Sequence, residues 1–193
     1  MTAAAIRTVR TRRLTRIEYE GLVERGVLDE DDPIELLDGR LVFREPQGSL
    51  HAAASLRARL ALDRAFGRGH HVRSQFPIAL DDVSEPEPDI AVVRGRIEDY
   101  LHGHPSSPVL VVEVADSSLA RDRRHKGGLY ARAGVTDYWI VNLVDRVLEV
   151  YRDPVRTPSG RWRYRHVRVL KPSATVVPLA APRARIRVAD LLP

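Results

Sequence analysis

A single acidic residue interrupts the most apolar stretch of the chain, PVLVVEVA at residues 108–115. A short run of valine and leucine bounded by turn residues predicts a buried strand, and Glu113 stands inside this one. An ionised carboxylate that leaves water loses several kcal/mol of hydration unless a cation or hydrogen bonds compensate it. The chain therefore has to bring a compensating group to Glu113, and this requirement restricts how its other segments can be arranged.

The composition is that of a soluble single-domain protein. The chain has 193 residues, of which 44% are hydrophobic and 30% are charged, and this length can bury a sizeable core. No apolar run approaches the roughly 20 residues of a membrane span, and the N-terminus lacks a signal-peptide segment. We therefore expect a cytoplasmic protein without membrane contact. The absence of cysteine excludes disulfides and thiolate sites, so any metal has to be held by carboxylates or histidines.

The basic residues are unevenly chosen. The formal net charge is +5, from 31 basic and 26 acidic residues, which permits binding to a polyanion without requiring it. Lys126 and Lys171 are the only lysines and all other basic residues are arginines, a bias that a GC-rich genome explains. In a chain that otherwise uses arginine, Lys126 indicates a place for a compact, titratable ammonium group.

The order of helical and extended patterns predicts one α/β (α+β) domain without repeats or linkers. Arginines without acids at residues 1–13 predict a basic flexible arm, and the domain occupies residues 14–193. Asp38-Gly39 between two apolar runs predicts a hairpin. Helices are predicted at 14–25, 50–66 and 118–133, strands at 71–80, 89–93, 109–115 and 161–170 and on both sides of 144–146, and a helical turn at 188–192.

Asp89 is a second acid beside a buried strand. The preceding prolines in EPEPD make a stiff, extended approach that aims its side chain. If the strands of Asp89 and Glu113 are neighbours, the two carboxylates converge at the strand ends. Converging carboxylates repel each other unless a cation lies between them, and a hard divalent ion prefers such oxygens, with the carbonyl of Val114 as a further ligand.

Lys126 follows Glu113 by 13 residues (126 − 113), on the next predicted helix. At i, i+4 spacing it shares a helix face with Asp122 and Tyr130. A helix that returns over the sheet could bring its ammonium group to the carboxylates, where it could orient a water and stabilise charge on a phosphate. The simpler alternatives are a turn residue at Asp89, a core acid paired with arginine at Glu113, and a solvated lysine paired with Asp122.

Several motifs together resemble the Uma-two family of restriction-endonuclease-like proteins, within the PD-(D/E)XK nuclease superfamily. They are ELLDGRLV, EPEPDIAVV, VLVVEVADSS, DRRHKGGLYARAGVTDYWIVN and LEVYRD, and the resemblance runs from about Glu35 to Tyr151. The resemblance implies a mixed central sheet flanked by helices, with a divalent-metal site at one edge. It assigns Asp89 to the first acidic element of the superfamily pattern and Glu113 to the second.

The lysine of the superfamily pattern is displaced in this chain. Ala115 stands two residues after Glu113 where the pattern has lysine, and Lys126 matches a lysine that has moved to the following helix. Glu35 resembles an additional acid that many of these nucleases contribute from near the first helix.

His51 and Tyr130 also match positions of the family. The residues alone favour a packed histidine at position 51, because it shares a helix face with Ala54, Ala58 and Leu62. A buried aromatic explains Tyr130 equally well.

The leading hypothesis is a Mg²⁺- or Mn²⁺-dependent endonuclease that cleaves DNA, with Asp89, Glu113 and the Val114 carbonyl at the metal. A second is a non-catalytic module that binds nucleic acid or a partner, because alternate arginines at 161, 163 and 165 would share one strand face. A third is a metal-dependent hydrolase of another substrate. No motif that reads a DNA sequence is visible, and a two-fold homodimer would suit the cleavage of two strands.

Overall fold

The computed structural model describes residues 12–29 and 31–193. The predicted basic arm, residues 1–13, lies outside the described residues except for its last two positions. None of the helices in the described part of the chain is long and apolar enough to cross a membrane.

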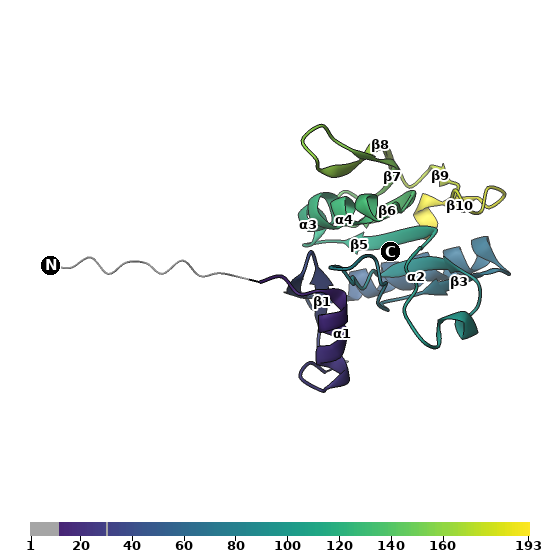
Figure 1. The fold of residues 1–193 in the computed structure, drawn as a ribbon. Coiled ribbons are helices and arrows are strands. Elements are labelled where there is room, and N and C mark those ends of the chain that lie inside the picture. The colour runs from purple at the N-terminus through teal and green to yellow at the C-terminus, as the bar shows by residue number, and fades with distance from the viewer. Residues whose placement is uncertain (1–11, 30) are drawn as a thin grey trace.

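A six-stranded mixed sheet forms the centre of the molecule, in the order β3-β4-β5-β6-β7-β8 (Figure 1). Neighbouring strands are antiparallel except β5 and β6, which are parallel. The mixed sheet predicted from the sequence is therefore confirmed. The strands are β3 (His70–Arg73), β4 (Ile90–Arg94), β5 (Leu110–Ala115), β6 (Asp137–Asn142), β7 (Val147–Arg156) and β8 (Trp162–Leu170).

Helices and two short hairpins surround this sheet. Figure 1 shows α1 at the lower end of the molecule and the β7–β8 ribbon at the upper end. The helices are α1 (Arg16–Glu24), α2 (Ser49–Phe66), α3 (Leu119–Arg121) and α4 (Gly127–Arg132), with 3₁₀ turns η1 (Ile97–Tyr100) and η3 (Val188–Asp190). The hairpins consist of β1 (Ile34–Leu37) with β2 (Arg40–Phe43) and of β9 (Thr175–Val176) with β10 (Ile186–Arg187).

Each face of the sheet carries its own apolar core. Helix α2 packs on one face through Ala54, Ala58, Leu62 and Phe66, together with the C-terminal segment. Helix α4 and the β1–β2 hairpin cover the other face. Because side chains alternate along β5, Val112 and Val114 enter the first core and Glu113 points to the side of α4.

Two predicted elements differ from the structure. The strand predicted at 71–80 ends at Arg73, because Gln75 adopts φ +55° and Pro77 lacks the amide that a strand ladder needs. The helix predicted at 118–133 contains a π turn, η2 (Asp122–Lys126), in which the Gly127 amide donates to the Asp122 carbonyl. The wider turn lies where Asp122 and Lys126 are both buried, and π turns frequently mark functional sites.

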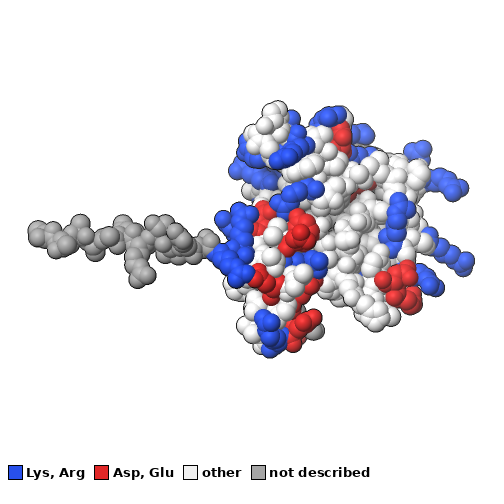
Figure 2. Space-filling view, in the orientation of Figure 1, with Lys and Arg blue, Asp and Glu red and all other residues white. Residues whose placement is uncertain are grey.

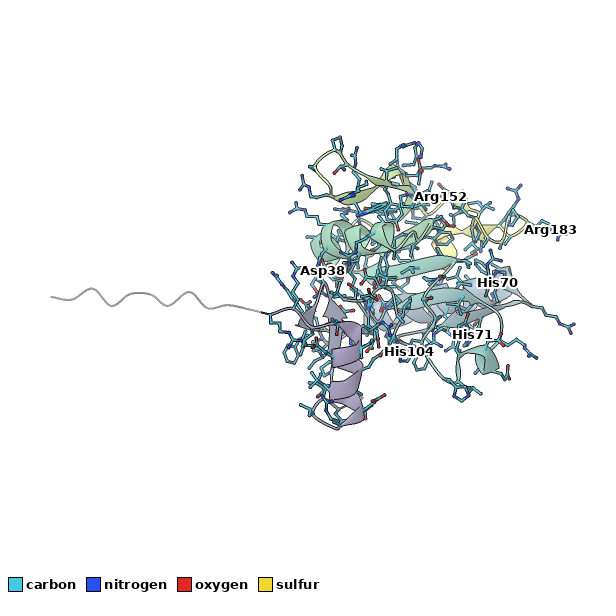
Figure 3. All side chains as sticks on the ribbon, in the orientation of Figure 1. Asp38, His70, His71, His104, Arg152 and Arg183 are labelled. Carbon is cyan, nitrogen blue, oxygen red and sulfur yellow. The ribbon has the colours of Figure 1, made fainter. Side chains whose placement is uncertain are left out.

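The β1–β2 hairpin is fixed from two sides. Arg132 at the end of α4 donates to Asp81 at 2.7 Å and to Asp38 at 2.5 Å, and Figure 3 labels Asp38 at the hairpin turn. The Glu85 amide donates to the Leu36 carbonyl at 2.7 Å, which ties β1 to the segment before β4. These contacts hold the hairpin, and Glu35 within it, over the face that contains Glu113.

We predict that Gly39→Ala destabilises the protein. Gly39 has φ +72°, and an added Cβ would lie 2.6 Å from the Arg13 Cβ and 2.8 Å from the Leu14 carbonyl oxygen. A strained backbone of this kind costs about 1–3 kcal/mol. Thermal and urea unfolding of Gly39→Ala should show this loss. Gly103→Ala is the control, because its Cβ would meet nothing within 4 Å; equal stability of the two variants would contradict the prediction.

Candidate active site

A pocket of about 140 Å³ lies where β4 begins and β5 ends, between the start of α2 and the helix that follows β5. Both strands present their ends here because they are antiparallel neighbours, with Ile90 opposite Val112. The residues just before β4 and near the end of β5 therefore come together, as the sequence analysis expected for Asp89 and Glu113.

Glu113 is compensated by two groups of the helix that follows β5. Only 3% of Glu113 is exposed. Its Oε1 atom lies 3.1 Å from the Lys126 Nζ and accepts a hydrogen bond of 2.7 Å from the Tyr130 hydroxyl. The partner of the acid within the valine run is thus the lysine and tyrosine one helix later, and not an arginine.

Lys126 bridges two carboxylates from different parts of the chain. Its Nζ lies 3.1 Å from Glu113 and 3.3 Å from the Oε2 atom of Glu35 on β1. Burial alone would lower the pKa of Lys126, but the charges of Glu113, Glu35 and the neighbouring aspartates raise it above its usual value. The amine is therefore a permanent buried cation that joins β1, β5 and the π turn.

Glu35 keeps one oxygen without a partner. Its Oε2 atom also accepts from the Glu87 amide at 3.2 Å. Its Oε1 atom is buried and, among the described residues, has no hydrogen-bond partner. A buried carboxylate oxygen is rarely left unpaired, so this atom indicates a place where a cation or a water would bind.

Asp89 is held by a backbone amide and a histidine. Its Oδ2 atom accepts from the Val114 amide at 2.7 Å and lies 3.2 Å from the His51 Nε2. Burial would lower the pKa of His51, but the hydrogen bond to Asp89, the charges of Asp89 and Glu113 and a backbone hydrogen bond with Val114 raise it above its usual value. The 3.2 Å contact with His51 therefore fixes the direction of the Asp89 side chain.

The pocket contains more negative than positive side chains. Its lining includes three permanent cations, Arg44, Arg121 and Lys126, and seven carboxylates, namely Glu35, Glu45, Glu87, Asp89, Glu113, Asp116 and Asp122. Burial and the charges of Asp122 and Asp89 raise the pKa of Glu113 above its usual value, although Lys126 opposes the shift. An additional cation would relieve this excess of negative charge.

The donor set fits a hard divalent ion that keeps most of its water. Among residues 12–29 and 31–193, no three histidine or carboxylate side chains converge as a complete protein ligand set. Lys126 occupies the space between Glu35 and Glu113, and His51 pairs with Asp89. Mg²⁺ is commonly bound by only one or two carboxylates together with waters, so the carboxylate oxygens and the unpaired oxygen of Glu35 suit it.

The structure groups the predicted residues into two linked sets. In the first set Lys126 contacts Glu35 and Glu113, and Tyr130 contacts Glu113. In the second set His51 contacts Asp89. The amide of Val114, the residue after Glu113, connects the two sets. The catalytic and metal-binding roles assigned to these residues stay predictions, including that of the Val114 carbonyl.

The sequence analysis missed Arg121, which lines the pocket. Arg121 is half-buried, and its Nε atom is shielded from solvent without a hydrogen-bond partner among the described residues. No ion pair of Arg121 occurs in the described part of the chain, whereas Arg123 two residues later pairs with Glu149 at 2.5 Å. In a chain with so many arginines, only the position in space distinguishes this one.

Comparisons with known proteins identify the family and agree with the fold. The model of the Uma2 family, described as a putative restriction endonuclease, matches residues 18–189. The crystal structure of a putative nuclease belonging to DUF820 from Anabaena variabilis ATCC 29413 has a TM-score of 0.70 and 19% sequence identity, and the match covers 92% of this chain and 97% of that one. This likeness shows that the fold is shared. A comparison with curated proteins gave no match.

Replacement of Lys126 should leave two buried carboxylates without their shared cation. We predict that Lys126→Met lowers the free energy of unfolding by about 3–5 kcal/mol in metal-free buffer, the usual cost of removing one partner of a buried ion pair. Lys171→Met is the matched control, because Lys171 is the only other lysine and is exposed. Urea unfolding measures both variants, and a loss for Lys126→Met no larger than the control would show that the carboxylates do not depend on it.

Proposed function

The chain belongs to the Uma2 family of putative restriction endonucleases, and we propose that it is a divalent-metal-dependent endonuclease that hydrolyses phosphodiester bonds in DNA. The observation that carries the proposal is the buried Lys126, held between Glu35 and Glu113 in a carboxylate-rich pocket that also contains Asp89. Carboxylates that can hold a metal ion and an amine that can stabilise phosphate charge suit metal-assisted phosphodiester hydrolysis.

We propose that Asp89, Glu113 and the Val114 carbonyl hold Mg²⁺ or Mn²⁺, with help from Glu35. The unpaired buried oxygen of Glu35 and the excess of carboxylates support this assignment. A divalent ion bound there would supply a Lewis acid that neutralises phosphate charge and lowers the pKa of a bound water.

The other residues position these groups. Two contacts of the Lys126 ammonium are used by Glu113 and Glu35, and an ammonium has three donors. The remaining donor would orient the attacking water or a phosphate oxygen. Tyr130 fixes Glu113 through its hydroxyl, and His51 fixes Asp89, so both are positioning residues in this proposal.

Arg121 would contact the substrate phosphate. Its side chain lines the pocket and has no carboxylate partner in the described part of the chain. A guanidinium fork matches two oxygens of a phosphate. A phosphodiester that enters the pocket would therefore find in Arg121 a cation that offsets part of the negative charge.

Two other functions have less support from the structure than the endonuclease. One is a non-catalytic module that binds nucleic acid or a partner through the arginines of β8. Arg163 and Arg165 are exposed on this strand, but Arg165 already forms an ion pair with Asp153 at 3.1 Å. A metal-dependent hydrolase of another phosphate ester would use the same pocket. A two-fold dimer would place two such pockets on the two strands of a duplex.

The first test is cleavage of plasmid and oligonucleotide DNA with Mg²⁺ and with Mn²⁺. We predict that Asp89→Asn and Glu113→Gln each lower the rate at least about a hundredfold, as expected for groups that stabilise a charged transition state. The exposed Arg124, outside the pocket, gives the control Arg124→Ala. Calorimetric titration with Mn²⁺ is a second readout. Absence of both cleavage and Mn²⁺ binding in the wild-type protein would overturn the proposal.

Arg121 is tested in the same assay. We predict that Arg121→Ala lowers the cleavage rate by about ten- to a hundredfold, the scale of one charge-assisted phosphate contact, and that Arg121→Lys recovers part of it. Mn²⁺ affinity should stay close to that of the wild type, because Arg121 does not hold the ion. Identical rates for Arg121→Ala and Arg124→Ala would show that this guanidinium does not contact the phosphate.

A further inference from the structure

A second and larger hollow, of about 500 Å³, lies between α2 and the C-terminal segment. It shares no lining residue with the carboxylate pocket. Arg57 and Arg64 reach it from α2, and Arg185 and Arg187 reach it from the region of β10. Two segments more than a hundred residues apart in the sequence thus bring four guanidinium groups to one groove.

The charges of this groove are mostly uncompensated. Asp190 is its only lining carboxylate, and Arg187 donates to it at 2.7 Å. Arg57 donates to the Ala189 carbonyl at 3.3 Å, which leaves its charge unneutralised. Within the described residues, neither Arg64 nor Arg185 forms an ion pair. The groove therefore has a surplus of three positive charges, the opposite of the carboxylate pocket.

The shape and chemistry of the groove suit phosphate groups on an extended ligand. All four arginines are exposed, and apolar residues such as Leu60 and Ile186 lie between them. Figure 2 shows basic side chains projecting along the edge of the molecule where β10 lies in Figure 1, and Figure 3 labels Arg183 on this edge. Converging like charges repel one another unless an anion lies between them, and guanidinium groups bind phosphate oxygens in pairs.

Helix α2 connects the groove to the carboxylate pocket. His51 near its start lies in the pocket, and Arg57 and Arg64 follow by 6 and 13 residues. At about 1.5 Å per residue they lie about 9 and 20 Å farther along the helix axis. A nucleic acid duplex covers these lengths in about three and six base-pair steps.

We propose that this arginine groove binds phosphate groups of the nucleic acid backbone at a distance of a few nucleotides from the cleaved bond. The inference rests on the proposed function for the identity of the ligand, whereas the phosphate chemistry rests on the groove alone. The groove would supply the attraction that a net negative catalytic pocket cannot supply to a polyanion.

The test compares two double variants that remove the same charge. Arg64→Ala/Arg185→Ala removes two of the four guanidinium groups of the groove. Arg59→Ala/Arg68→Ala removes two exposed arginines from the same helix region that do not line it. Binding of a fluorescent DNA duplex is measured by anisotropy without divalent ions, over a series of salt concentrations. We expect the groove variant to bind about tenfold more weakly and with a shallower salt dependence, by about one to two units of slope.

Each outcome decides the inference. An equal effect of the two double variants would show that only net charge matters and would overturn it. If the wild-type protein does not bind the duplex, the binding of inorganic phosphate is measured by calorimetry. Phosphate binding that the groove variant loses would assign the site to a small phosphate compound and overturn the nucleic acid ligand. Absence of phosphate binding would overturn the site itself. Cleavage with Mg²⁺ is measured separately, so failure of the proposed nuclease activity is distinguishable from failure of the groove.

Discussion

The ion arrangement around Lys126 is the constraint on which the rest of the structure depends. Glu113 lies in the central strand β5, Glu35 in a hairpin over the same face, and Lys126 in the π turn between them. Neither carboxylate could be buried in this way without the amine, and the amine could not be buried without them. The ion pairs of Lys126 therefore hold the hairpin against the sheet. Apolar packing alone would leave Glu35, Glu113 and Lys126 buried without compensation.

Much of the fold could be predicted from the sequence because the order of apolar, polar and turn residues within single segments indicates a strand, a helix or a turn. The valine-rich strands, the long alanine- and leucine-rich helix and the Asp38-Gly39 turn each carry a clear signal, and the mixed sheet is confirmed. The early end of β3 and the π turn at Asp122–Lys126 were not predictable in the same way. The π turn and the φ of Gln75 are backbone conformations that the three-dimensional surroundings impose, whereas Pro77 is a signal in the sequence against the longer strand.

The candidate site was predictable only in part. The acid in an apolar strand demanded a cation, and the rarity of lysine indicated Lys126, which does contact Glu113. The nearness of Glu35 followed from family resemblance, because nothing local in β1 reveals it. The roles of Arg121 and of the arginine groove could not be predicted, because arginines are common in this chain. Only the three-dimensional structure shows which of them lie together in a pocket or groove.

The π turn also has a consequence for how such a chain can change during evolution. In an ordinary α-helix one inserted residue rotates every later side chain by about 100° about the axis, which would turn Arg132 away from the hairpin. A wide turn absorbs an extra residue, so the two ends of the helix keep their neighbours while the residues within the turn move. The turn at Asp122–Lys126 can thus present the amine to the sheet while Arg132, on the next turns of the helix, keeps its contact with the hairpin.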